Sequence, residues 1–155
     1  MRRLIIALAI ASIPGLALAG AWDSGMVEDE GGPAMMAWVY GEGGGDVPPE
    51  LRMMCGDSMG LRYGMGSGPG EGIEPIMDPL DFEFDFGTEK LVLEMQYEGM
   101  DGMYAAYFPI TAKVIGLLKS SSGVSVSDPT GTYHAQPFSL EGSSRAIDAL
   151  LKTCG

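Results

Sequence analysis

The sequence predicts an α+β domain: an antiparallel β-sheet or small sandwich with two short helices, the C-terminal helix tied by a disulfide. Residues 80–86 alternate between apolar and acidic side chains, as a half-buried strand does. Two later runs, 111–119 and 143–154, space their apolar residues as the buried stripe of a helix does. The second run ends on Cys154, whose single possible partner within the chain is Cys55.

The first residues are typical of a Sec-type signal peptide, which we expect at 1–19. Two arginines precede an apolar run at 4–13, and the small residues that follow offer cleavage after Ala19. A second small-residue pattern would allow cleavage before Trp22. The apolar run is shorter than the roughly 20 residues of a membrane span. We therefore expect a periplasmic or secreted protein with no membrane span after signal cleavage.

The mature chain has room for one domain. We expect an acidic, exposed N-terminal arm at 20–33, in which Trp22 can anchor against the body, and a single disulfide-stabilised domain at 34–155. Export brings both cysteines into an oxidising compartment, where a structural disulfide is the default. The bridge would close a loop of about 100 residues, which the chain-entropy model values at about 4 to 5 kcal/mol.

Six strands are expected before the first helix. They are bounded by glycine, proline and polar turn residues, and they lie at 34–40, 51–55, 59–63, 80–86, 91–97 and 103–108. Between them, 41–49 and 64–79 contain too much glycine and proline for regular structure and are expected to be loops.

The last third is expected to hold a helix, a brief strand and a strand-turn-helix unit. Thr111 is expected to cap a helix that continues to Lys119, followed by strands at 124–126 and 132–140. Gly142 breaks the second strand, so that one of the two following serines can cap the C-terminal helix. The apolar stripe of that helix turns the final cysteine inward.

The end of the chain resembles the ends of several families of small exported bacterial proteins. The pattern is Phe138-x-Leu140-x-Gly142-x-x-x-Ala146-x-x-x-Leu150-x-x-x-Cys154, after a helix and a short strand. It is similar to the VasI-like proteins associated with type VI secretion and, less closely, to the invasion-associated locus B family. The resemblance covers the last third and the upstream cysteine. It implies a bridge from Cys55 to Cys154 and a non-enzymatic accessory or envelope protein, with no catalytic residues to transfer.

The charge of the chain narrows the class of partner. The sequence has 21 acidic and nine basic residues, a formal charge of −12 at pH 7, and it becomes −14 when the two arginines of the signal leave. Such acidity disfavours nucleic acid and anionic lipid surfaces. We expect a non-enzymatic exported binding protein without a cofactor, whose partner is another envelope or secretion-system protein. Contact is expected at the acidic strand face and the two glycine-rich loops.

A metal-binding protein is the alternative hypothesis. Two sets of residues are its candidates: Met53, Met54 and Met59 for Cu(I), and Asp81, Glu83 and Asp85 for Ca²⁺. Each set has a simpler explanation. Methionine fills irregular cores, and adjacent strand residues point to opposite faces. Carboxylates at two-residue spacing are usually the solvated face of a strand.

A small serine hydrolase is the third hypothesis, and the sequence disfavours it. Residues 56–60 match the Gly-x-Ser-x-Gly nucleophile elbow, and Ser58, Asp128 and His134 follow in the hydrolase order. However, the elbow requires a helix after the turn, and the glycines at 64 and 66 cannot sustain one. A lone histidine in a strand is more often a structural or surface residue than a ligand.

Overall fold

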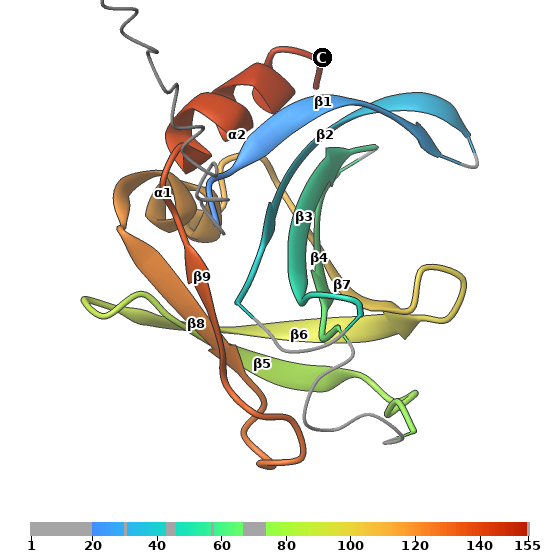
Figure 1. Ribbon diagram of the computed structural model, residues 1–155, viewed down its shortest axis with the longest axis vertical. Helices are drawn as coiled ribbons and strands as arrows, with labels where there is room; N and C mark the ends of the chain where they lie inside the picture. Colours follow the sequence, from blue (N-terminus) through green and yellow to red (C-terminus); the bar gives the residue numbers. More distant parts are fainter. Residues whose placement is uncertain (1–19, 30, 43–45, 57, 67–73, 155) are drawn as a thin grey trace, which may run out of the picture.

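The computed structural model describes residues 20–29, 31–42, 46–56, 58–66 and 74–154. These residues form one nine-stranded sheet and two helices (Figure 1). The strands are β1 (Asp23–Asp29), β2 (Gly32–Tyr40), β3 (Glu50–Cys55), β4 (Met59–Gly64), β5 (Leu80–Asp85), β6 (Lys90–Glu98), β7 (Met103–Phe108), β8 (Gly123–Ser127) and β9 (Gln136–Ser139). Their order in the sheet is β1-β2-β3-β4-β7-β6-β5-β8-β9, and every pairing is antiparallel. The predicted α+β class is confirmed.

The sheet folds over at β6. The first part of this strand pairs with β5, from Lys90 opposite Asp85 to Met95 opposite Leu80, and its last three residues pair with β7. The two halves of the sheet therefore face each other and share one apolar core. Aromatic rings dominate its centre, where Tyr63 meets Phe82 edge to face with ring centroids 5.4 Å apart.

The chain before β1 helps to close the sheet. Trp22 is only 2% exposed, its backbone N–H donates to Glu141 O at 2.8 Å, and its indole N–H donates to Ser139 O at 3.1 Å. At Gly41 a Cβ atom would lie 3.0 Å from the Phe138 ring, so glycine lets the end of β2 approach β9. These contacts hold β9 against the residue before β1 and the residue after β2.

The exposed arm expected at 20–33 takes a different form in the structure. Trp22 does anchor it, but the residues that follow form β1, which pairs with β2 along its whole length. The sequence of β1, Asp-Ser-Gly-Met-Val-Glu-Asp, contains few residues that favour strands. Backbone pairing with β2 outweighs that weak local preference.

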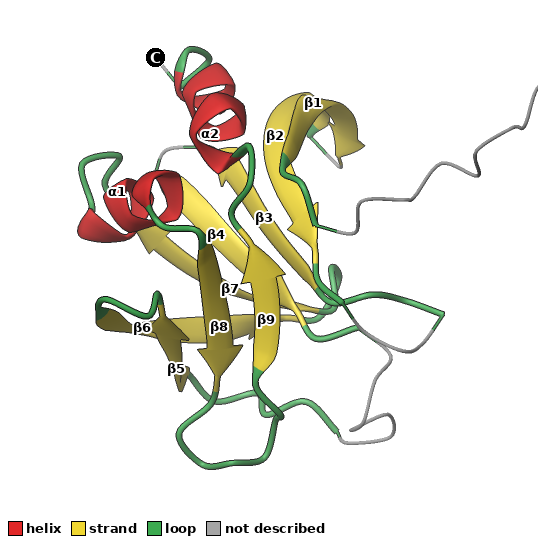
Figure 2. Cartoon of the chain, turned by 60° about the vertical axis from the view of Figure 1, so that its left-hand side comes forward, coloured by secondary structure: helices red, strands yellow, loops and turns green. Residues whose placement is uncertain are grey.

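Both helices lie at the same end of the sheet (Figure 2). They are α1 (Lys113–Ser120), which buries Val114, Ile115 and Leu118, and α2 (Ser143–Leu151), which buries Ser143, Ala146, Ile147 and Leu150. The predicted caps are wrong, because the N-cap residues are Ala112 and Gly142 and neither helix has a side-chain cap. Gly142 has a φ of +78°, a conformation that favours glycine.

The remaining strand predictions hold to within one or two residues, with one exception. The strand expected at 132–140 is only β9, because Asp128 holds the residues before it in a turn. No helix among the described residues has the length and hydropathy to cross a membrane. The predicted signal peptide and the centres of both glycine-rich loops lie outside the described residues.

Candidate binding cleft

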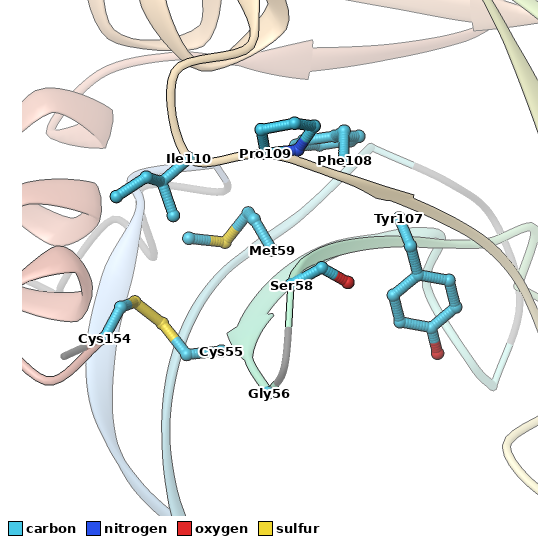
Figure 3. A pocket seen from close by; sticks show the side chains of 9 residues that line it. All are labelled: Cys55, Gly56, Ser58, Met59, Tyr107, Phe108, Pro109, Ile110 and Cys154. Atoms are coloured by element: carbon cyan, nitrogen blue, oxygen red, sulfur yellow. A yellow bond between two sulfur atoms is a disulfide. The ribbon is translucent and has the colours of Figure 1, made fainter.

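An open cleft of about 750 Å³ lies near the ends of the two helices (Figure 3). It is formed by the turn between β3 and β4, the end of β7 with the two residues that follow it, and the segment after α2. The described residues that line it are Cys55, Gly56, Ser58, Met59, Tyr107, Phe108, Pro109, Ile110 and Cys154. Segments far apart in the sequence therefore build this site together.

One wall of the cleft is the disulfide between Cys55 and Cys154, as predicted. Cys55 is the last residue of β3, and Cys154 follows the end of α2. Their Cα atoms are 5.6 Å apart, and both residues pack partly buried against the core. The bridge thus fixes the end of the chain against the sheet at the edge of the cleft.

Apolar side chains form the floor and one side of the cleft. Met59 is fully buried, and Figure 3 shows it between the disulfide and Ile110. Ile110 is 52% exposed, and the turn that carries it is fixed by the hydrogen bond from Ala112 N–H to Pro109 O at 2.8 Å. Ile110 also lines a groove of about 510 Å³ along α1, to which Leu151 contributes as well. Ile110 is thus shared by the cleft and this groove, whose lining mixes apolar residues with Lys113 and Lys119.

Tyr107 stands at the other side of the cleft and is 55% exposed. Its hydroxyl donates to the Glu98 carboxylate at 2.5 Å, and partial burial together with this hydrogen bond raises the pKa of Tyr107. Gly60 lies opposite Tyr107 in the β4–β7 pair, and a Cβ atom there would be 3.2 Å from the ring. Glycine at this position leaves room for the ring to lie over β4.

The charged groups behind Tyr107 are paired with one another. Arg62 Nε lies 2.7 Å from a Glu98 carboxylate oxygen, and Arg52 on the neighbouring strand lies 2.8 Å from Glu50. Arg52 and Arg62 are opposite each other in the β3–β4 pair. Each guanidinium therefore has a carboxylate partner, and the Arg62–Glu98 pair positions Tyr107, whose hydroxyl contacts both residues.

The methionine candidates for Cu(I) do not share one face of the sheet. Met53 and Met59 are fully buried in the core, whereas Met54 points to the opposite face. There the thioether sulfur of Met54 contacts the guanidinium of Arg62. The core positions of Met53 and Met59 agree with the packing explanation.

The acidic strand face predicted on β5 carries its own counter-ion. Lys90 Nζ lies 2.8 Å from a Glu83 oxygen and 3.2 Å from an Asp85 oxygen, while Asp81 is exposed farther along the strand. Within the described residues, no three His, Cys, Asp or Glu side chains are placed to share a metal ion. Lys90 thus forms ion pairs with two of the three carboxylates proposed as Ca²⁺ ligands.

The hydrolase candidates are not brought together. Ser58 precedes β4 and lines the cleft, whereas Asp128 lies near Tyr63 at the other end of β4. Burial and the charge of Asp128 raise the pKa of Tyr63. The Asp128 carboxylate accepts from the backbone N–H groups of Thr130 at 2.9 Å and Tyr133 at 2.5 Å. His134 is exposed and lies outside any strand.

We expect Asp128→Asn to destabilise the fold by about 1 to 3 kcal/mol at neutral pH, because the new amide sets an N–H group against backbone donors. Burial raises the pKa of Asp128, but its hydrogen bonds outweigh burial and hold that pKa below its usual value. The contribution of the carboxylate is therefore complete above about pH 4 and is lost as the pH falls through the lower folded-state pKa. Urea unfolding of both proteins at a series of pH values measures this difference. A difference that grows on acidification would contradict the assignment.

The sequence did not point to Tyr107 or Ile110. The one available signal was an isoleucine directly after the proline that ends β7, since connecting segments are usually polar at such exposed positions. The disulfide wall, by contrast, was predictable, because two cysteines in a chain with an expected signal peptide indicate a structural bridge.

No protein-family model matches the chain, and no curated protein matches its sequence. A solved structure does match: the crystal structure of invasion associated protein B from Bartonella henselae, with a TM-score of 0.58 and 12% sequence identity. The match covers 86% of this chain and 92% of that chain. At this identity the likeness concerns the fold. The chain therefore shares its fold with an invasion associated protein B, in agreement with the resemblance to the invasion-associated locus B family.

Proposed function

We propose that this protein is an exported, non-enzymatic envelope protein that binds a segment of another protein in the cleft beside the disulfide. The observation that carries the proposal is the composition of the cleft. Exposed Tyr107 and Ile110 flank a buried apolar floor, and the described lining residues include no acidic, basic or histidine side chain. Concave surfaces with apolar and aromatic linings are typical binding sites, and tyrosine is enriched at protein interfaces.

The surroundings of Ser58 support a binding role over catalysis. A serine nucleophile needs a general base within hydrogen-bond reach, and the described residues that line the cleft supply none. The disulfide and the predicted signal peptide support export, because such bridges persist in oxidising compartments. The fold shared with an invasion associated protein agrees with an accessory role at the cell envelope.

The shape of the site favours an elongated occupant. The cleft shares Ile110 with the groove along α1, so the two depressions together are longer than a compact small molecule needs. A segment of a partner chain can place one large apolar side chain over Met59 and continue toward Leu151. We therefore assign the cleft to an apolar protein segment.

We expect Ile110→Asp to weaken partner binding by about 10- to 100-fold, because a carboxylate in an apolar contact loses its hydration without a counter-charge. Photocrosslinking from position 110 in the exported protein identifies the partner, and calorimetry with that purified partner measures the affinity. Val92→Asp is the matched control, since Val92 is 58% exposed on β6 and outside the cleft lining. Equal losses in both variants, or no loss in Ile110→Asp, would refute the assignment.

A further inference from the structure

The outer edge of β1 is separate from the cleft, whose described lining residues include none of β1. β1 lies at one end of the sheet, and β2 is the strand that pairs with it. The other end, β9, is covered by the contacts of Trp22 and Gly41. The second half of β1 continues past α2 beside β2 (Figure 1).

The direction of the backbone groups along this edge follows from two hydrogen bonds. Trp22 N–H donates to Glu141 O, and Ser24 N–H donates to the carboxylate of Asp23 at 2.8 Å, so both point away from β2. Alternate residues of a strand point their N–H groups to the same side, which places those of Met26 and Glu28 on this outer side as well. In the part of the chain that the structure describes, neither of these two N–H groups has a side-chain or loop partner.

The side chains of β1 indicate the kind of partner. Met26 is 63% exposed and lies between Asp23 on one side and Glu28 and Asp29 on the other. Among the described residues, these three carboxylates take part in no ion pair. Five of the cations pair with carboxylates elsewhere: Arg52, Arg62, Lys90, Lys113 and Lys119. The open edge therefore presents an apolar side chain between uncompensated negative charges.

We propose that β1 binds an extended basic segment of a partner protein, which pairs with it as a further antiparallel strand of the sheet. Main-chain hydrogen bonds to Met26 and Glu28 would supply affinity, and the acidic side chains would select the partner. A second copy of this chain fits poorly. Antiparallel pairing of two β1 strands about Met26 places Asp23 of each copy opposite Asp29 of the other, and directly opposed like charges are destabilising.

The test uses the mature, oxidised protein and the synthetic peptide acetyl-Lys-Lys-Val-Leu-Val-Thr-Lys-amide. In antiparallel register its leucine lies opposite Met26, and its lysines lie opposite Asp23, Glu28 and Asp29. We expect the amide NMR signals of Met26 and Glu28 to shift and their hydrogen exchange to slow. The control peptide replaces every lysine with glutamate, and it should bind at least tenfold more weakly at low salt.

Two variants separate strand pairing from general charge attraction. Met26→Pro removes an outward N–H group and no hydrogen bond to β2, and it should weaken peptide binding at least tenfold. Replacement of Asp23, Glu28 and Asp29 by lysine should reverse the preference between the peptides, which keeps the proposal testable if the proline variant does not fold. Unshifted Met26 and Glu28 signals at saturating peptide, or equal binding of both peptides, would overturn it. Dimerisation through this edge in sedimentation experiments would also overturn it, in favour of a second copy.

Discussion

Reduction of the bridge between Cys55 and Cys154 should lower the free energy of unfolding by about 4 to 5 kcal/mol. The bridge spans a sequence separation of 99 residues, so it removes much conformational freedom from the unfolded chain. Small domains are typically stable by about 5 to 15 kcal/mol, which makes this loss a large fraction of the total. Denaturant unfolding with and without a reductant measures it, and the melting temperature should fall accordingly.

The control for this prediction is the double variant Cys55→Ala, Cys154→Ala. It should unfold with nearly the stability of the reduced protein and should respond no further to the reductant. Stability that is unchanged by reduction in the wild type would contradict a structural bridge. A reductant effect that persists in the double variant would show that the reductant acts elsewhere.

Elements with a strong local pattern were predictable from the sequence. Phe82 and Phe84 alternate with acidic residues on β5, and both are fully buried in the structure. The stripe of Ala146, Ile147 and Leu150 likewise faces the core from α2. In these segments the period of apolar residues determines which face is buried, and the rest of the fold follows that choice.

The closure of the sheet depends on contacts that no local pattern records. β6 changes partner from β5 to β7 along its length, and nothing in its alternation marks the change. β1 is a strand because β2 offers it hydrogen bonds, although its own residues favour turns. The helix starts differ from expectation for a similar reason, since Gly142 supplies a left-handed backbone where a serine cap was expected.

Only the disulfide wall of the candidate site was predictable from the sequence. Two cysteines in a chain with a predicted signal peptide leave a single intrachain pairing. Tyr107 and Ile110 line the cleft because β7 pairs with β4. This pairing places both residues near the disulfide, although they are far from either cysteine in the sequence. Such convergence depends on strand order, and several strand orders are compatible with the same alternation of residues.

Trp22→Ala should lower the free energy of unfolding by about 3 to 5 kcal/mol, the usual cost of removing a buried large aromatic side chain. The indole is buried beside β9 and donates to Ser139 O, so the variant loses packing and a hydrogen bond at the point where the sheet closes. Thermal and denaturant unfolding of the purified variant measure the change. We expect the backbone hydrogen bond from residue 22 to Glu141 to weaken as well, because the ring that holds this segment in place is gone.

Two variants show which part of Trp22 matters. Trp22→Phe keeps most of the ring but loses the indole N–H, so it should cost about 0.5 to 1.5 kcal/mol for the hydrogen bond, with a further loss from imperfect packing. Trp38→Ala removes the same kind of side chain from a half-buried position on β2 and should cost less than Trp22→Ala. If Trp22→Ala were no worse than Trp38→Ala, the segment before β1 would be a dispensable arm. The larger loss expected at Trp22 would instead show that this segment is a structural part of the closed sheet. It would also explain how β1 stays in place although it pairs with a neighbouring strand, β2, on one side only.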